Sequence, residues 1–371
     1  MQLDQTTSAD YLAEARRQIE ICNACRYCEG YCAVFPAMTR QKCFSDGDLT
    51  QLANLCHNCR GCYHACQYTA PHEFALNVPA ALAEVRQQSW ESLAAPSWLA
   101  RRFHESGGAV AAVLVVSLAL MILLMQALKP ATGEGFYAYL GHGAMVAIFT
   151  PAFVAPLVLV GVALRAYWRT VGGGRLGLNE LRAAMAQAAR LRNLDGGQGQ
   201  GCNFEGADRP TNRRRYAHQA VLYGFLLCLA ATSVATLMHY LLDWPAPYGL
   251  FTLPKLFGIP GGLLMVVGSV ELMRLKLRAE PELGAKRVWG GEMAFTAMLG
   301  FVAASGLLLY AATGTGFVSS LLAVHLASVL ALFLLLPYSK MVHGFFRLAA
   351  LIVEVQRGQA QVRMDDVAER Q

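Results

Sequence analysis

Six stretches of this chain are each long and apolar enough to cross a lipid bilayer, which needs about 20 such residues per helix. The first reads "AVAAVLVVSLALMILLMQAL" and contains no charged residue. Six stretches of this length and composition are not expected as buried helices of a soluble protein. The sequence therefore predicts a mainly α-helical protein with a six-helix transmembrane bundle. The expected spans are residues 109–128, 140–164, 217–242, 257–274, 293–312 and 317–339.

Lysine and arginine lie almost entirely on one side of these spans. Of the 31 basic residues, only Lys129 and Lys255 fall in the loops that face the other way. Because basic residues concentrate on the cytoplasmic side of membrane proteins, both termini are expected in the cytoplasm. The predicted location is a bacterial-type inner (cytoplasmic) membrane, with multiple passes. The net charge of +6 follows from this topology and does not indicate nucleic-acid binding.

Eight of the eleven cysteines form two runs of equal spacing, "CNACRYCEGYC" and "CHNCRGCYHAC". Residues 1–20 contain no apolar signal segment, so the runs are expected in a reducing cytosolic domain, where metal binding is favoured over disulfides. The spacing C-x2-C-x2-C-x3-C is that of two-cluster ferredoxins, in which the fourth cysteine binds the other cluster. A structural zinc site would use separated cysteine pairs instead. The predicted ligands are Cys22, Cys25, Cys28 and Cys66 for a first [4Fe-4S] cluster, and Cys56, Cys59, Cys62 and Cys32 for a second.

Three further cysteines lie outside this pattern, and two of them, Cys43 and Cys202, lie outside the predicted spans. Cys43 is expected to be a buried thiol, with a ligand of a three-iron cluster as the alternative. Cys202 lies in "GGQGQGCNFEG", which lacks the Lys-Ser/Thr of a phosphate loop. It is expected to be a small packed side chain in a flexible connector under the cluster domain, with a ligand role as the alternative.

Five histidines lie within or at the ends of the spans, where ionisable residues are costly and mark functional sites. His218 and His239 are about 31 Å apart on one helix, and His325 and His343 are expected about 27 Å apart on one face of another. Two pairs at two depths predict two b-type haems, each held by neutral imidazoles from different helices. The expected pairs are His218 with His343 for the inner haem, and His239 with His325 for the outer haem.

His142 is the fifth of these histidines, and it is close enough to the outer side to replace His239 as a ligand or to serve a quinone site. The structural alternative for each histidine is a hydrogen bond to a neighbouring helix. No C-x-x-C-H motif is present, which excludes covalently attached c-type haem.

Several motifs resemble known families. "PYSKMVHGFFR" is similar to the end of a haem-binding helix in the nitrate reductase gamma subunit and the membrane subunit of heterodisulfide reductase, which implies His343 as an axial ligand. "CNACRYCEGYCAVFPAM", "LANLCHNCRGCYHACQY" and "PHEFALNVPAAL" resemble the tricarballylate-utilisation protein B (CitB-like) family over essentially the whole chain. That resemblance implies electron transfer from a cytosolic FAD-dependent dehydrogenase, which converts tricarballylate to cis-aconitate, into the membrane.

The sequence therefore predicts an electron-transfer subunit that passes electrons through two [4Fe-4S] clusters and one or two haem b groups to a membrane quinone. It would be the redox subunit of a flavoprotein dehydrogenase:quinone oxidoreductase system. The alternatives are a membrane-anchored iron–sulfur sensor, a heterodisulfide-reductase-like subunit, which would carry adjacent cysteines, and a transporter with a regulatory cluster domain.

The expected organisation follows from these features. An interfacial linker is predicted to be amphipathic near "SWLARRF", with Trp90, Trp98 and Arg101 at the level of the headgroups. The predicted regions are a ferredoxin-like α-helical two-cluster domain (1–80), the interfacial linker (81–108), two spans (109–164), a cytoplasmic loop (165–216), four spans with haem ligands (217–347) and a cytoplasmic tail (348–371).

Overall fold

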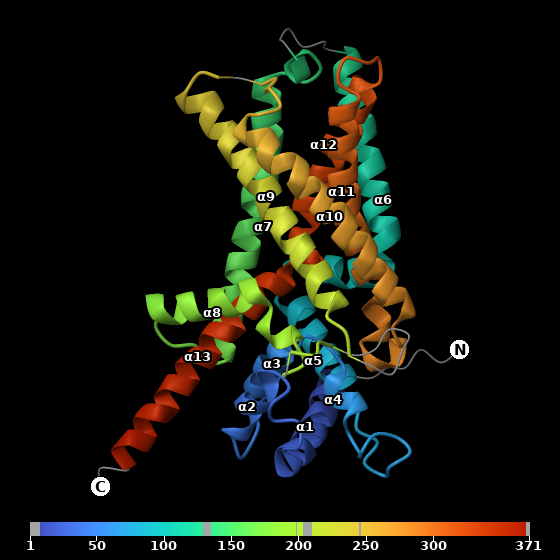
Figure 1. Cartoon of the computed structure of the whole chain (residues 1–371). Coiled ribbons are helices and arrows are strands. Elements are labelled where there is room, and N and C mark those ends of the chain that lie inside the picture. The colour runs from blue at the N-terminus through green and yellow to red at the C-terminus, as the bar shows by residue number, and fades with distance from the viewer. Residues whose placement is uncertain (1–7, 129–134, 198, 203–209, 245, 369–371) are drawn as a thin grey trace.

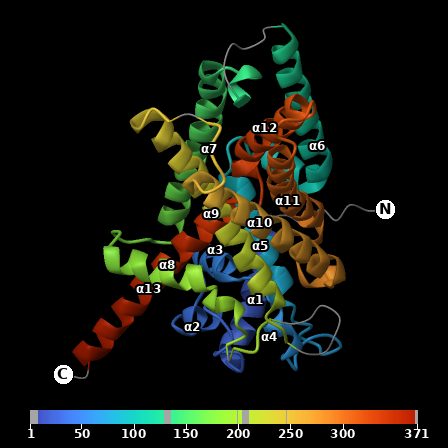
Figure 2. The same ribbon diagram turned by 45° about the horizontal axis from the view of Figure 1, so that its top comes forward.

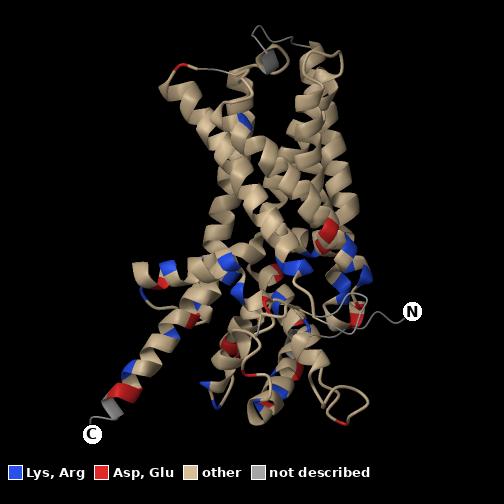
Figure 3. Ribbon diagram, in the orientation of Figure 1, with Lys and Arg blue, Asp and Glu red and all other residues tan. Residues whose placement is uncertain are grey.

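The computed structural model describes residues 8–128, 135–197, 199–202, 210–244 and 246–368 of the 371. The described residues form helices and turns, with one isolated β-bridge between Cys202 and Thr211. A bundle of long helices stands on a smaller helical head, and charged residues concentrate at the end of the bundle that carries the head (Figures 1 and 3).

All six predicted spans are long helices. Their outward side chains are apolar: Val113, Val116 and Leu120 on the first of them are each more than half exposed. Helices satisfy their backbone hydrogen bonds internally, so such surfaces suit contact with lipid. The protein thus has the architecture of a multi-pass membrane protein. The six helices are α6 (Ser97–Leu128), α7 (His142–Thr170), α9 (Arg213–Leu241), α10 (Leu253–Arg278), α11 (Trp289–Ala311) and α12 (Val318–Leu335).

Glycines bring α9 and α10 into close contact. A Cβ atom on Gly261 would lie 2.9 Å from the carbonyl oxygen of Gly224, and one on Gly268 would lie 2.7 Å from the carbonyl oxygen of Ala217. Small residues at such crossings let two backbones approach closely inside a membrane. This crossing holds the helix that carries His218 and His239 in place.

Replacing Gly261 with alanine is expected to destabilise the bundle by about 1–3 kcal/mol, because the new methyl group meets backbone atoms that cannot move independently. Gly258 is the matched control on the same helix, since its Cβ would lie 3.6 Å from the Cβ of Ala231, an ordinary contact. Gly258→Ala should be neutral or stabilising, because alanine favours helix over glycine. Thermal denaturation in detergent compares the two variants, and equal midpoints would contradict the packing argument.

The head consists of five helices, α1 (Ser8–Cys25), α2 (Val34–Thr39), α3 (Asp46–Leu55), α4 (Gly61–His64) and α5 (Val78–Leu93). Helix α3 begins with a capping box: the Ser45 hydroxyl accepts a hydrogen bond from the Asp48 amide, and the Asp48 carboxylate accepts one from the Ser45 amide. The helix ends at Leu55, so the second cysteine run starts directly at its C-terminal end.

The head and the lower end of the bundle share one hydrophobic core. Tyr167 of α7 donates a hydrogen bond of 2.7 Å to the amide oxygen of Gln51, and the Gln51 amide group donates one of 2.8 Å to the carbonyl of Ala350 on α13 (Val342–Ala368). Leu49 and Phe346 belong to the same cluster of buried side chains. The head is therefore fixed against the bundle by packing and not only by the chain connection.

Two expectations about local structure are wrong. His325 and His343 do not share one helix, because α12 ends at Leu335 and Pro337 lies in a short 3-10 turn before α13 begins. Proline lacks the amide hydrogen that a continuing helix needs. Trp90 does not reach the headgroups: it is 5% exposed, and its indole donates a 2.9 Å hydrogen bond to Asn54, whereas Trp98 is 61% exposed.

The stretch between α7 and α9 contains α8 (Leu178–Arg190), which packs against α13 beside the lower end of the bundle (Figures 1 and 2). The region expected as a cytoplasmic tail, 348–371, continues α13 as far as Ala368.

Candidate iron–sulfur and haem centres

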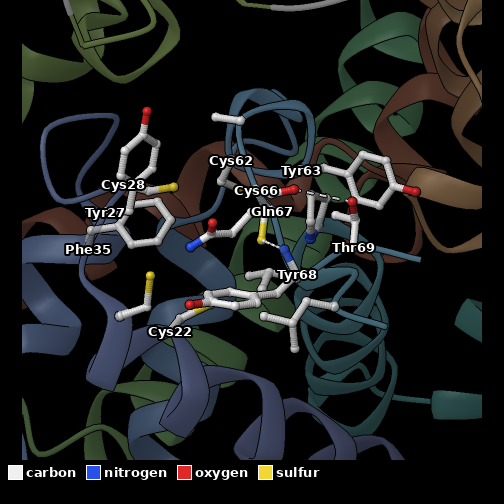
Figure 4. A pocket seen from close by; sticks show the side chains of 15 residues that line it. Cys22, Tyr27, Cys28, Phe35, Cys62, Tyr63, Cys66, Gln67, Tyr68 and Thr69 are labelled. Atoms are coloured by element: carbon white, nitrogen blue, oxygen red, sulfur yellow. Dashed lines mark hydrogen bonds between the residues drawn. The ribbon is translucent and has the colours of Figure 1, made fainter. Parts of the chain in front are cut away.

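The first group of cysteines lines a cavity of about 230 Å³ in the head (Figure 4). Helix α1 ends at Cys25, where Arg26 takes the left-handed conformation with a φ of 56°. Burial and then the neighbouring thiols of Cys66, Cys28 and Cys25 together raise the pKa of the Cys22 thiol to about 12. The fourth cysteine of the second run thus lies beside the first three cysteines of the first run, and all four line this cavity.

The second group is formed in the same crossed way. Burial raises the pKa of the Cys32 thiol, and so do the nearby thiols of Cys59 and Cys56. The pKa of Cys62 is raised by burial and then by Cys59, Cys56 and Cys32. Asn58 and Arg60 adopt left-handed conformations between these cysteines, with φ values of 51° and 68°. The structure therefore brings together the two sets of four cysteines that the spacing predicts, and their role as ligands stays a prediction.

The chemistry of both groups fits an iron–sulfur cluster. All the cysteines are free thiols. Among the described residues, no three His, Cys, Asp or Glu side chains converge on a single metal ion. A four-iron cluster does not require such convergence, because its four cysteine ligands surround a cubane and not one ion. The raised thiol pKa values mean that cluster binding would have to displace protons.

Cys43 and Cys202, the two cysteines outside both the runs and the spans, differ from each other. Cys43 is exposed in the loop between α2 and α3, so the expectation of a buried thiol is wrong. Cys202 is buried, and its thiol lies 3.4 Å from the carbonyl oxygen of Leu194. A hydrogen bond from Cys202 lowers the pKa of Cys59 to about 6. The glycine-rich segment is docked on the head, because a Cβ on Gly197 would lie 2.2 Å from the carbonyl oxygen of Gly30.

The inner histidines meet at the junction of head and bundle. The ring centroids of His218 on α9 and His343 on α13 are 5.9 Å apart, with an angle of 82° between the rings. The Nδ1 atom of His343 donates a 2.5 Å hydrogen bond to the carbonyl of Lys340, which leaves Nε2 as the nitrogen with a lone pair. Burial, together with the charges of His218, Arg347 and Lys340, lowers the pKa of His343. Its imidazole is therefore neutral at pH 7, the form that binds iron.

The outer histidines have different neighbours from those expected. The rings of His142 and His239 are stacked, with centroids 4.5 Å apart and an angle of 22°. The Tyr240 hydroxyl lies 3.3 Å from Nε2 of His142. His325 instead lies on α12 with its Nδ1 atom 3.1 Å from the Ser305 hydroxyl. The geometry thus brings His239 to His142, the alternative ligand, whereas its pairing with His325 stays a prediction that this arrangement does not favour.

In the part of the chain that the structure describes, two of these histidines have a ring nitrogen without a hydrogen-bond partner. The Nδ1 atoms of His218 and His239 are buried, and neither has a hydrogen-bond partner among the described residues. Burying a polar nitrogen without a partner costs free energy, so such atoms call for a role beyond packing. Both histidines lie on α9, one near each end of the span.

Sequence reasoning missed three arginines at the junction, Arg86, Arg214 and Arg347, which donate to backbone carbonyls between Ala53 and Asn58. A signal was present: Arg214 precedes His218 by four residues, and Arg347 follows His343 by four. Residues four apart share a helix face, so each arginine lies one turn from an inner histidine.

Fold and site together define a class of protein: a polytopic membrane protein with a cysteine-rich, ferredoxin-like head. The family model "Citrate utilization protein B Fer4-like domain" matches residues 15–92, and the model "Citrate utilization protein B" matches residues 101–364. The Escherichia coli protein named citrate utilization protein B is 41% identical over 354 residues, which cover 93% of each chain. No solved structure matches. The chain belongs to the citrate utilization protein B family, which is the CitB-like family that its cysteine motifs resemble.

Proposed function

We propose that this chain is a membrane-bound electron-transfer subunit that carries electrons from a cytosolic FAD-dependent dehydrogenase to the quinone pool. The observation that carries the proposal is the junction itself: the segment that begins with Cys56 lies against the helices that carry His218 and His343. The name of the Escherichia coli relative refers to citrate utilization, and the sequence resemblance implies tricarballylate, so the dehydrogenase would oxidise a tricarboxylate of this kind.

The residues divide the task between head and bundle. The two crossed sets of cysteines would hold two [4Fe-4S] clusters, and His218 with His343 would hold the inner haem b. Bound there, these groups supply one-electron transfer. For the outer haem b, the stacked rings favour His142 and His239 as the ligands. Head and termini would lie on the cytoplasmic side, because the basic residues concentrate at that end of the bundle (Figure 3).

The exposed side of the first cysteine group is where the dehydrogenase would dock. Cys25 is exposed, and the neighbouring Tyr27 is 72% exposed. The second cysteine group lies next to the bundle, since Arg347 of α13 donates to the carbonyl of Cys56. Electrons would therefore enter at the first group and leave the head at the second.

The test is a dithionite-reduced minus oxidised optical spectrum of the detergent-purified protein, with a pyridine haemochrome assay, followed by addition of a soluble quinone. We expect about two b-type haems per chain and rapid reoxidation by the quinone. A protein that retains about eight iron atoms but no haem would overturn the proposal and favour the membrane-anchored sensor. A reduced haem that quinone does not reoxidise would contradict the assignment of quinone as the acceptor.

A further inference from the structure

The last turn of α3 and the start of the second cysteine run are held by three arginines from three different helices. Arg86 of α5 donates to the carbonyls of Cys56 (2.9 Å) and Ala53 (3.3 Å). Arg347 of α13 donates to the carbonyls of Asn54 (3.3 Å) and Cys56. The carbonyls at a helix C-terminus carry partial negative charge and lack partners within the helix, so cations are stabilised there.

The third arginine comes from α9, the helix that carries His218. Arg214 of α9 donates to the carbonyls of Asn58 (2.7 Å) and His57 (3.3 Å). The carbonyls from Ala53 to Asn58 are therefore attached to α5, α9 and α13 at once. This segment has little freedom to move relative to the inner histidines.

The three guanidinium groups bring more positive charge than carbonyls alone would balance. Within the described residues, none of these three arginines forms an ion pair with a carboxylate. Burial and the neighbouring Arg86 lower the pKa of Arg347 to about 9, and the thiols of Cys56 and Cys32 oppose that shift. Enclosed charges are costly unless an opposite charge compensates them. Cys56 and Cys32 of the second group lie near enough to Arg347 to act on its charge, and as thiolates they would supply the opposite charge.

Arg347 also lies between the two kinds of centre. It follows His343 by one helical turn on α13. His57, which neighbours Cys56 in the chain, has a buried Nδ1 atom without a hydrogen-bond partner among the described residues. Burial lowers the pKa of His57, and the nearby charges of Arg347, His218 and Arg214 lower it as well.

We propose that Arg347 is a positioning residue that raises the reduction potential of the second cluster and fixes that cluster against the inner haem helix. Reduction adds one electron, and hence one negative charge, to the cluster, with no proton required. A guanidinium that is already in place stabilises the added charge. The cluster next to the bundle would then be the better electron acceptor of the two, which directs electrons from the exposed first group towards the membrane. This proposal rests on the proposed function, because it requires that the clusters are bound.

The experiment is a redox titration of the full-length protein in detergent, followed by electron paramagnetic resonance, for the unaltered protein and for Arg347→Gln, Arg347→Lys and Arg357→Gln. In Arg347→Gln the midpoint potential of one cluster should become more negative, while that of the other stays constant. Arg347→Lys should retain most of the potential, because the positive charge remains. Arg357 is the matched control: it lies on the same helix, donates to the carbonyl of Val171 and pairs with Asp48 in the first turn of α3, at the end of that helix away from Cys56. Its replacement should move neither potential.

The outcomes separate the two proposals. Unaltered protein without cluster signals would overturn the proposed function. Two cluster signals that Arg347→Gln leaves in place, or shifts equally, would overturn only the role of Arg347. If Arg347→Gln does not assemble, Arg86→Gln provides the same comparison from α5, since Arg86 also donates to the Cys56 carbonyl. An unchanged potential in Arg86→Gln would then overturn the charge argument.

Discussion

Replacing Cys66 with alanine is expected to remove the first cluster, although this residue belongs to the second run, and to lower the non-haem iron content from about eight to about four atoms per chain. The reason is the crossed arrangement, in which Cys66 lies beside Cys22, Cys28 and Cys25. Cys32→Ala should remove the second cluster in the same way, because its neighbours are Cys59 and Cys56. Iron analysis and electron paramagnetic resonance measure both effects.

Double variants make this test decisive. If Cys22 and Cys66 bind one cluster, Cys22→Ala/Cys66→Ala should lose no more iron than either single variant. Cys22→Ala/Cys32→Ala should lose both clusters, because under crossed ligation these two residues bind different clusters. Cys43→Ala is the control, since this exposed cysteine should leave the iron content unchanged. Uncrossed ligation would reverse the two double variants: Cys22→Ala/Cys66→Ala would lose both clusters.

Replacing His343 with alanine is expected to remove the inner haem, to lower haem from about two to about one per chain, and to stop electron transfer to quinone. His343 offers Nε2 to iron because its Nδ1 is held by the Lys340 carbonyl, and His218 faces it at 5.9 Å between ring centroids. His218→Ala should show the same loss. The pyridine haemochrome assay measures haem, and dithionite-reduced clusters that no longer reoxidise with quinone report the interrupted path.

The outer site provides the internal comparison. His142→Ala should lose the outer haem and keep the inner one, whereas His325→Ala should keep both, because His325 interacts with Ser305. The opposite result, with haem lost from His325→Ala and retained in His142→Ala, would restore the pairing of His239 with His325. Non-haem iron should stay constant in all four histidine variants, since none of these residues lies in the head.

The sequence alone determined the features that depend on local spacing. The spacing of the cysteines indicates which thiols can bind the same cluster, so the two sets of four could be predicted without knowledge of the fold. The six spans followed from the length of the apolar stretches, and the basic residues indicated which end of the bundle carries the head. His218 and His239 were correctly placed near opposite ends of one helix, because residue counts along an unbroken helix convert directly into distance.

Only the tertiary structure decided which groups from separate helices meet. His142 lies against His239 because of how α7 and α9 pack, and apolar sequence does not encode the rotation of one helix about another. Pro337 interrupted the helix on which His325 and His343 were counted together. The roles of Trp90 and Arg347 likewise depend on where the head docks: the same residue types on an unpacked surface would face headgroups or water, whereas here they contact Asn54 and the Cys56 carbonyl. Local spacing can be read directly from the sequence, whereas contacts between elements far apart in sequence depend on how the whole core packs.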